Sequence, residues 1–478
     1  MKLIFDVSDK PKAGQLVVFA LQQMLAILAA TIAVPLIIGN GLTPAAAMFG
    51  AGVGTIVYIL FTKRKSPVFL GSSFAFLGSM AAAFAGGVSM QLGMLGLIIG
   101  ALLAGLVYVV IAIVVKFVGV GWLNKLMPAV VIGPTVAIIG LSLAGNAIGD
   151  LLKGDVTKQV TEYVVSTGSG TPEIIETVSN VPVGSSYVAL VCGLITLAVV
   201  MLCSTYGKKT LKLIPFIIGI LAGYAAAAIF TVIGNICDID ALKIVDLSVF
   251  SSYMLTDGSI SLKTFVSLPD FAFVSGLKGL KEFDFSYFAT IFVAYVPVAL
   301  VVFAEHVADH KNLSSIIDHD LLEEPGLTRT LLGDGVGSIA GALFGGCPNT
   351  TYGESVACVA ITGNASVITI FAAAIGCMLF SFITPLVAFV DSIPACVMGG
   401  VCIALYGFIA VSGLKMIQDV NLDDNRNLFV VSVILIAGIG GLTLTFGDIT
   451  LTEVAAALIL GILTNVMLSK KKGNADKK

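Results

Sequence analysis

Apolar segments long enough to cross a lipid bilayer recur along the whole chain. Hydrophobic residues make up 57% of the 478 residues and charged residues only 12%, about half the charged fraction of a soluble domain. A spanning helix needs roughly 20 apolar residues, and about fourteen segments approach that length. Because lipid offers the backbone no hydrogen bonds, the sequence predicts an all-α polytopic membrane protein. The segments begin near residues 14, 44, 66, 91, 124, 186, 212, 286, 326, 347, 366, 393, 428 and 451.

The distribution of basic residues predicts the orientation of these spans. With the N-terminus inside, the inside segments contain most of the 26 Lys and Arg residues, including the cluster at 63–65 and the lysines of the C-terminal tail. The two long polar loops, 149–185 and 237–285, then lie outside. Cytoplasmic loops are enriched in Lys and Arg. We therefore expect both termini in the cytoplasm and the protein in the plasma (inner) membrane.

Two stretches of the first half of the chain recur in the second half. Residues 50–61 (GAGVGTIVYILF) match residues 333–344 (GDGVGSIAGALF) at seven of twelve positions. Residues 128–133 (PAVVIG) and 394–399 (PACVMG) follow in the same order. This order indicates a duplication with about seven spans in each half. Because an odd number of spans inverts the second copy, we predict a seven-plus-seven inverted repeat.

Polar residues interrupt the third and the tenth predicted span. Residues 66–85 contain Gly-Ser-Ser at 71–73, and residues 347–365 contain Pro-Asn-Thr-Thr-Tyr-Gly-Glu at 348–354. Irregular backbone is tolerated at membrane depth only where protein buries it or a wet cavity lines it. We predict a short extended piece joined to a half-helix in each span. The positive N-terminal ends of the two half-helices should point at one place near the midplane.

Two acids within predicted spans are the main candidates for a binding site. Glu354 follows Gly353 near the start of a half-helix, and Glu305 lies in the eighth span. A charge at mid-membrane costs roughly 2.5–3.5 kcal/mol on insertion scales, so such residues are functional candidates by default. Alternatively, Glu354 caps its own half-helix, and Glu305 is a structural acid paired with His306 or with another helix.

Further titratable residues lie close to these acids in the sequence. Asp309 follows Glu305 by four residues on the same helix face, so it could relay protons or tune Glu305. Asp334, near the start of the ninth span, is either an interfacial acid or part of a proton path. His310 and His319 are expected near the cytoplasmic end of the span or in a solvated segment. No metal-binding motif occurs, so we expect no metal and no cofactor.

Short motifs through the chain carry a resemblance to a known family. They are LGSSFAF (70–76), AEHV (304–307), DLL (320–322) with PGL (325–327), PNTTYGE (348–354), AIT (360–362), and VMGG (397–400) with LYG (405–407). Together they resemble the uracil permeases of the nucleobase:cation symporter family, which also contains the nucleobase–ascorbate transporters. The resemblance extends from about residue 14 to about residue 468, and PNTTYGE is typical of its uracil-type branch.

The resemblance implies two domains and a mode of action. The core domain would comprise spans 1–4 (14–120) and 8–11 (286–390). The gate domain would comprise spans 5–7 (121–236) and 12–14 (391–468). Members of the family are homodimers, and the bacterial carriers couple uptake to protons, so the resemblance implies both properties for this chain.

The resemblance also implies a binding site for a flat, neutral nucleobase. Glu305 and Glu354 would accept hydrogen bonds from the ring N–H groups of uracil. Backbone N–H groups at Phe74 and Gly353 would bind a ring carbonyl. Such a site penalises analogues that leave its polar groups unpaired. The remaining implied residues are Ala30, Tyr352 and Tyr406 as pocket lining, with ordinary packing the alternative for Tyr406, and Asp309 and His306, together with Glu305, in proton coupling.

The chain departs from the family pattern beside the predicted site. The family signature has Asn and Gly at the positions of Ser355 and Ala357. A bacterial uracil carrier has His at the position of Asp309. These departures affect the prediction of how transport is coupled and of which pyrimidine is bound, more than the prediction of the fold.

The sequence therefore predicts a proton-coupled importer of uracil. A purine or xanthine permease of the same fold is the nearest alternative. An anion carrier is a more distant one, since two acids in the site disfavour an anionic substrate. The chain contains no set of nucleophile, base and orienting group, so we do not expect an enzyme. No basic tract suggests a nucleic-acid partner; the expected partners are the nucleobase, protons and the lipid bilayer.

Overall fold

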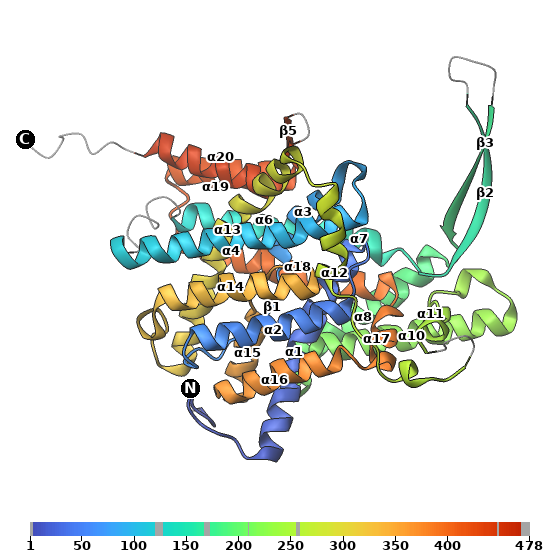
Figure 1. The fold of residues 1–478 in the computed structure, drawn as a ribbon, viewed down its shortest axis with the longest axis horizontal. Helices are drawn as coiled ribbons and strands as arrows, with labels where there is room; N and C mark the ends of the chain where they lie inside the picture. The colour runs from blue at the N-terminus through green and yellow to red at the C-terminus, as the bar shows by residue number, and fades with distance from the viewer. Residues whose placement is uncertain are drawn as a thin grey trace, which may run out of the picture. The chain divides into compact units, whose positions relative to one another are not determined.

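The computed structural model describes residues 3–119, 128–166, 173–208, 210–254, 259–446 and 449–469 (Figure 1). The predicted start of the fifth span near residue 124 and the lysines of the C-terminal tail lie outside these residues. The chain forms two compact units. Unit 1 comprises Met1–Leu143, Phe265–Val387 and Leu405–Lys478, and unit 2 comprises Ala144–Thr264 and Ala388–Ala404. The core and gate domains proposed from the sequence stay a prediction.

Eight helical segments in the described part of the chain are long and apolar enough to cross a membrane. They agree with the predicted all-α polytopic class, whereas the number of spans and the inverted repeat stay predictions. The eight are α1 (Ala13–Ile38), α2 (Pro44–Phe61), α4 (Met90–Val118), α6 with α7 (Ala129–Leu151), α8 (Ser186–Tyr206), α10 (Pro215–Cys237), α13 (Phe285–Ile317) and α18 (Ala395–Met416).

The remaining elements are shorter. In unit 1 they are helices α3 (Leu77–Ala83), α12 (Ala272–Gly276), α14 (Leu327–Gly345), α15 (Gly353–Thr362), α16 (Val367–Phe380), α19 (Asn425–Ile439) and α20 (Glu453–Leu468), and strands β1 (Leu70–Ser72), β4 (Asn349–Thr351), β5 (Leu444–Phe446) and β6 (Ile449–Leu451). In unit 2 they are helices α9 (Thr210–Leu213) and α11 (Ser248–Met254) and the hairpin of β2 (Thr157–Ser166) and β3 (Glu173–Pro182). Helix α17 (Thr384–Asp391) runs from unit 1 into unit 2.

The two matching glycine-rich stretches form helices α2 and α14, which pack side by side in unit 1 (Figure 1). A Cβ atom added at Gly54 would lie 2.8 Å from the carbonyl oxygen of Gly337 on the facing helix. On the other side of α14, a Cβ at Gly335 would lie 3.0 Å from the carbonyl oxygen of Gly105 on α4. Small residues let helix backbones approach closely inside a membrane protein. The repeated glycines therefore set the spacing of α2, α14 and α4.

The extended pieces of the two broken spans pair with each other. Strands β1 and β4 are antiparallel, with Leu70 opposite Thr351 and Ser72 opposite Asn349. A 3₁₀ turn (Phe74–Phe76) and α3 follow the first strand, and α15 follows the second. The predicted combination of a short extended piece and a half-helix is confirmed in both spans. Pairing satisfies backbone groups that lipid cannot.

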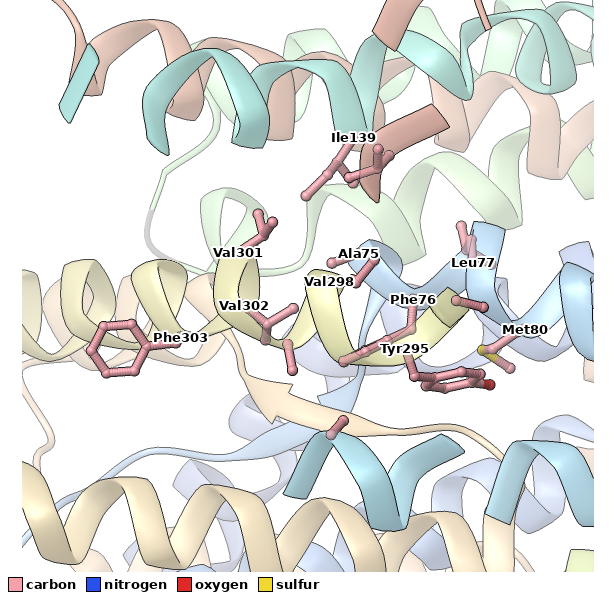
Figure 2. Close-up of a cluster of buried hydrophobic side chains, with 14 of the residues drawn as sticks. Ala75, Phe76, Leu77, Met80, Ile139, Tyr295, Val298, Val301, Val302 and Phe303 are labelled. Atoms are coloured by element: carbon pink, nitrogen blue, oxygen red, sulfur yellow. The ribbon is translucent and has the colours of Figure 1, made fainter. Parts of the chain in front are cut away.

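The half-helix α3 is fixed against the long helix α13. Figure 2 shows Phe76 beside Tyr295 of α13, and their rings stack with centroids 5.4 Å apart. The Ser79 hydroxyl donates a hydrogen bond to the carbonyl oxygen of Ala294 at 2.6 Å. Val298, one turn further along α13, belongs to the same buried cluster. Because α13 also carries Glu305, this packing joins one broken span to one of the predicted acids.

Asp155 joins three segments within unit 2. Its carboxylate accepts a hydrogen bond from the backbone N–H of Ala395, the first residue of α18, at 3.1 Å. Its own N–H donates to the carbonyl oxygen of Ile244 at 3.0 Å. The N–H of Cys396 donates to the carbonyl oxygen of Lys153 at 3.0 Å. The start of α18 is thus held by the segment that follows α7.

We expect Gly54→Ala to lower the stability of the folded protein. The added methyl group would press on the carbonyl of Gly337, and overpacking of this kind costs roughly 1–3 kcal/mol. The measurement is the melting temperature of the purified protein in detergent. Gly14→Ala is the matched control, because a Cβ at Gly14 meets no atom within 4 Å. Equal melting temperatures for the two variants would contradict the role given to Gly54.

We expect Asp155 to make stability depend on pH. Burial raises the pKa of its carboxyl from 3.8 to about 6; the Ala395 N–H opposes this rise, and the nearby Asp246 and Asp150 add to it. The folded state then binds the proton more tightly than the unfolded state, so stability falls as pH rises from about 4 to about 6. Over this pH range, the free energy of unfolding of the wild type should fall by on the order of 1 kcal/mol relative to that of Asp155→Asn. Melting curves at several pH values test this, and parallel curves for the two proteins would refute it.

Candidate functional site

All the predicted site residues lie in unit 1, on elements that surround the paired strands. Glu305 is on α13, Asp309 is one turn further along, and Glu354 is the second residue of α15. Each of the three side chains is partly exposed rather than sealed in the core. Glu305 is close enough to Asp309 and Glu354 for direct electrostatic interaction. The fold therefore gathers the predicted acids from two distant parts of the chain.

The two half-helices begin beside these acids. The 3₁₀ turn starts at Phe74 and α15 starts at Gly353. The first N–H groups of a helix have no partner within that helix, and its N-terminus carries a partial positive charge. A Cβ at Gly353 would meet no atom within 4 Å, so open space adjoins the start of α15. The carboxylate of Glu354 therefore lies next to the N–H groups at the start of α15.

Aromatic residues enclose this region. The rings of Phe74 and Tyr406 meet edge to face with centroids 6.0 Å apart. Tyr352 is buried, and its hydroxyl donates to the carbonyl oxygen of Ser72 at 2.8 Å. Ala30 of α1 is only 1% exposed. The structure therefore places Phe74 beside Tyr406, and it gives the Tyr352 hydroxyl a structural partner on β1.

Asp309 ties α13 to the paired strands. Its carboxylate accepts a hydrogen bond from the hydroxyl of Thr351 on β4 at 2.8 Å. A charged acceptor strengthens such a bond. The partner of Asp309 is therefore Thr351, three residues before Glu354.

His306 is directed toward α14. Its Nδ1 lies 2.7 Å from Oδ2 of Asp334, and its Nε2 lies 3.0 Å from the Thr330 hydroxyl. The same hydroxyl donates to the carbonyl oxygen of Leu327 at 3.0 Å. Both ring nitrogens of His306 thus lie within hydrogen-bond distance of residues on α14. The pairing of His306 with Glu305, considered from the sequence, is not observed.

His310 was expected near the cytoplasmic end of its span or in a solvated segment. It lies in the last turns of α13, and its side chain is fully buried rather than solvated. Its Nε2 lies 2.6 Å from the Tyr58 hydroxyl, which lies 2.7 Å from the Ser66 hydroxyl. Helix α13 continues to Ile317, about two turns beyond the histidine. His319 is exposed, as predicted.

Ser355, one of the predicted departures from the family pattern, is bonded on two sides. Its hydroxyl oxygen accepts hydrogen bonds from the side-chain amide of Gln23 on α1 and from the backbone N–H of Phe69, the latter at 3.0 Å. Gln23 is 2% exposed. The sequence analysis did not predict this contact, although a pair of glutamines within an apolar span indicates that a polar partner lies nearby. The start of α15 is thus fastened to α1 and to the segment before β1.

No group of three or more His, Cys, Asp or Glu side chains in the described part of the chain is arranged to hold a metal ion. The described cysteines are free thiols.

Comparison with known proteins identifies the family. Residues 14–446 match the family model described as the Permease family. The chain belongs to this family. It is 36% identical to the uracil permease of Bacillus caldolyticus over 478 residues, which covers 99% of this chain and 97% of the relative. It is 34% identical to the uracil permease of Bacillus subtilis, with coverage of 98% and 96%. The resemblance carried by the short motifs is confirmed, and the chain is a transporter rather than an enzyme.

A solved structure supports the fold. The transmembrane domain of a cyanobacterium bicarbonate transporter superposes with a TM-score of 0.61 at 13% sequence identity. The match covers 96% of this chain and 100% of that domain. The chain is therefore a multi-pass membrane protein with a transporter fold, and this second likeness concerns the fold alone.

We expect Ser355→Ala to destabilise the protein. The substitution leaves the Phe69 N–H and the Gln23 amide without their acceptor, and an unpaired buried donor costs about 1–3 kcal/mol. Thermal unfolding in detergent measures the loss. Ser8→Ala, at an exposed position of the N-terminal segment, is the control. A Ser355→Ala protein as stable as this control would show that the two bonds contribute little.

Proposed function

We propose that this chain imports uracil across the plasma membrane, coupled to protons, by alternating access. The relatives are named uracil permeases, and the acids beside the half-helices supply the complementary chemistry. Uracil has two ring N–H donors and two carbonyl acceptors. Glu305 and Glu354 accept from the donors, and the N–H groups of Phe74 and Gly353 donate to a carbonyl. Phe74, Tyr352, Tyr406 and Ala30 form the surrounding wall.

Glu305 is the proposed proton-carrying group. It lies on α13 one turn before Asp309 and within electrostatic reach of Asp309 and Glu354. Protonation of Glu305 favours the occluded, substrate-bound state, and proton loss on the cytoplasmic side releases uracil. Asp309 and His306 assist by holding α13 against β4 and α14.

The proposed cycle moves a core domain (spans 1–4 and 8–11) against a gate domain (spans 5–7 and 12–14). About fourteen spans in a seven-plus-seven inverted repeat place the broken spans at the centre of the core domain. Both termini are cytoplasmic, and the protein is a homodimer. The repeated stretches on α2 and α14 support this arrangement, since the two copies pack against each other.

A purine or xanthine permease is the second candidate, because the same donors and acceptors also complement a purine. Competition experiments separate the two candidates. Excess unlabelled uracil, but not xanthine, should suppress uptake of labelled uracil. Suppression by xanthine at lower concentration than by uracil would favour the second candidate.

We expect purified protein in proteoliposomes to accumulate labelled uracil when an inward proton gradient is imposed. An uncoupler should abolish the accumulation but leave equilibration of uracil intact. Glu305→Gln should lose the gradient-driven accumulation, because the amide cannot carry the proton. Glu323→Gln, the same change at an exposed position, should behave as the wild type. Full accumulation by Glu305→Gln would remove Glu305 from the coupling mechanism.

A further inference from the structure

The segment before α1 runs alongside the connection between α15 and α16 (Figure 1). We call residues 3–9 the N-terminal strap. Phe5 and Asn364 form a parallel bridge, so the strap acts as a short added strand. The backbone hydrogen bonds are Ile4 N–H to Gly363 O at 2.7 Å, Phe5 N–H to Gly363 O at 3.2 Å, Ala365 N–H to Phe5 O at 2.9 Å and Val367 N–H to Val7 O at 3.2 Å.

The far end of the strap is fastened as well. The Ser366 hydroxyl donates to the carbonyl oxygen of Asp9 at 2.6 Å. A turn closes between Asp6 and Asp9, where the Asp9 N–H donates to the Asp6 carbonyl at 3.1 Å and the Asp6 N–H donates to the Asp9 carboxylate at 2.8 Å. The strap is therefore an ordered structure with bonds at both ends.

Side chains of the strap alternate between the protein and the outside. Leu3 and Val7 pack against a buried cluster, whereas Ile4 is 63% exposed. Alternation of this kind is the period-two pattern of a strand with one covered face. The buried cluster joins the half-helix to its neighbours and consists of Tyr58, Val68, Leu70, Leu313, Ile317, Leu321, Val356, Val359 and Ala365.

The strap holds the end of α15 opposite to Glu354. Gly363 ends this helix in the left-handed conformation, with φ of 67°, and its carbonyl accepts both strap N–H groups. The other end is fastened through Ser355. A helix of ten residues is about 15 Å long. A tilt at Gly363 therefore pivots α15 about its fastened end and changes the direction in which Glu354 points.

We propose that the N-terminal strap is a positioning element for the substrate-binding half-helix. It fixes the angle of α15, and through that angle it sets the place of Glu354 in the nucleobase site. This inference rests on the proposed function for the identity of the ligand, but the link between strap and helix is independent of it. Leu3, Val7 and Ser366 act through α15 and do not touch the substrate.

Ile4 offers a matched pair of variants. Ile4→Pro removes the N–H that donates to Gly363, whereas Ile4→Ala keeps it and trims only an exposed side chain. Hydrogen exchange of the α15 amides, measured on the full-length protein in detergent, should rise about fivefold in Ile4→Pro, the equivalent of one net hydrogen bond. The dissociation constant for labelled uracil should also rise about fivefold. Ile4→Ala should match the wild type in both.

Ser366→Ala provides a second, independent test, because it removes only the hydroxyl that bonds Asp9. Ser366→Thr keeps a hydroxyl and should restore both readouts. If both Ile4→Pro and Ser366→Ala lower the melting temperature while exchange in α15 and uracil affinity stay at the wild-type level, the strap is structural only and the proposal is wrong. A wild-type protein that binds no uracil would refute the proposed function, and the exchange of α15 would still decide the role of the strap.

Discussion

The pairing of β1 with β4 is the interaction on which the rest of the structure depends. Two strands of three residues cannot persist alone, and unpaired edge groups are costly in a membrane. The surrounding helices supply the missing partners. Thr55 of α2 bonds both the N–H and the carbonyl of Leu70, and Ser338 of α14 accepts from the N–H of Asn349. Close packing of α2 on α14 is therefore required to complete this small sheet.

The same constraint explains where the polar side chains lie. Breaking two spans creates helix N-termini inside the membrane, and each needs acceptors or a ligand. Helices α13 and α1 bond side chains beside these N-termini: Asp309 accepts from the Thr351 hydroxyl on β4, and the Gln23 amide donates to the Ser355 hydroxyl on α15. A buried polar network is stable only when its members are satisfied. The side chains of Glu305 and Glu354 are partly exposed, and their role in binding a nucleobase stays a proposal.

The sequence predicted which backbone segments form the site better than it predicted the contacts between their side chains. Proline and glycine at bilayer depth were enough to locate the extended pieces and half-helices, since few structures tolerate them there. Spacing on one helix also related Asp309 to Glu305. It could not reveal that His310 is buried against Tyr58, because that contact joins residues 252 positions apart. Nor could it reveal the strap, whose bonds are made by backbone groups that every residue possesses.

The departure at Ser355 illustrates a second limit of sequence patterns. The sequence marks Ser355 only as a departure from the family pattern, whereas the structure pairs it with Gln23 of another helix. Only the fold reveals this pairing.

A transporter fold shared at 13% identity with a bicarbonate transporter leaves the ligand undetermined. The ends of two half-helices attract negative charge, which by itself would suit an anion. In this chain Glu354 already occupies the first turn of α15, and Glu305 adds a second acid nearby. An incoming anion would meet both carboxylates, whereas a neutral molecule with N–H donors would satisfy them. In the proposed site, these two side chains therefore favour a neutral hydrogen-bond donor over an anion, although the half-helix ends alone would attract negative charge.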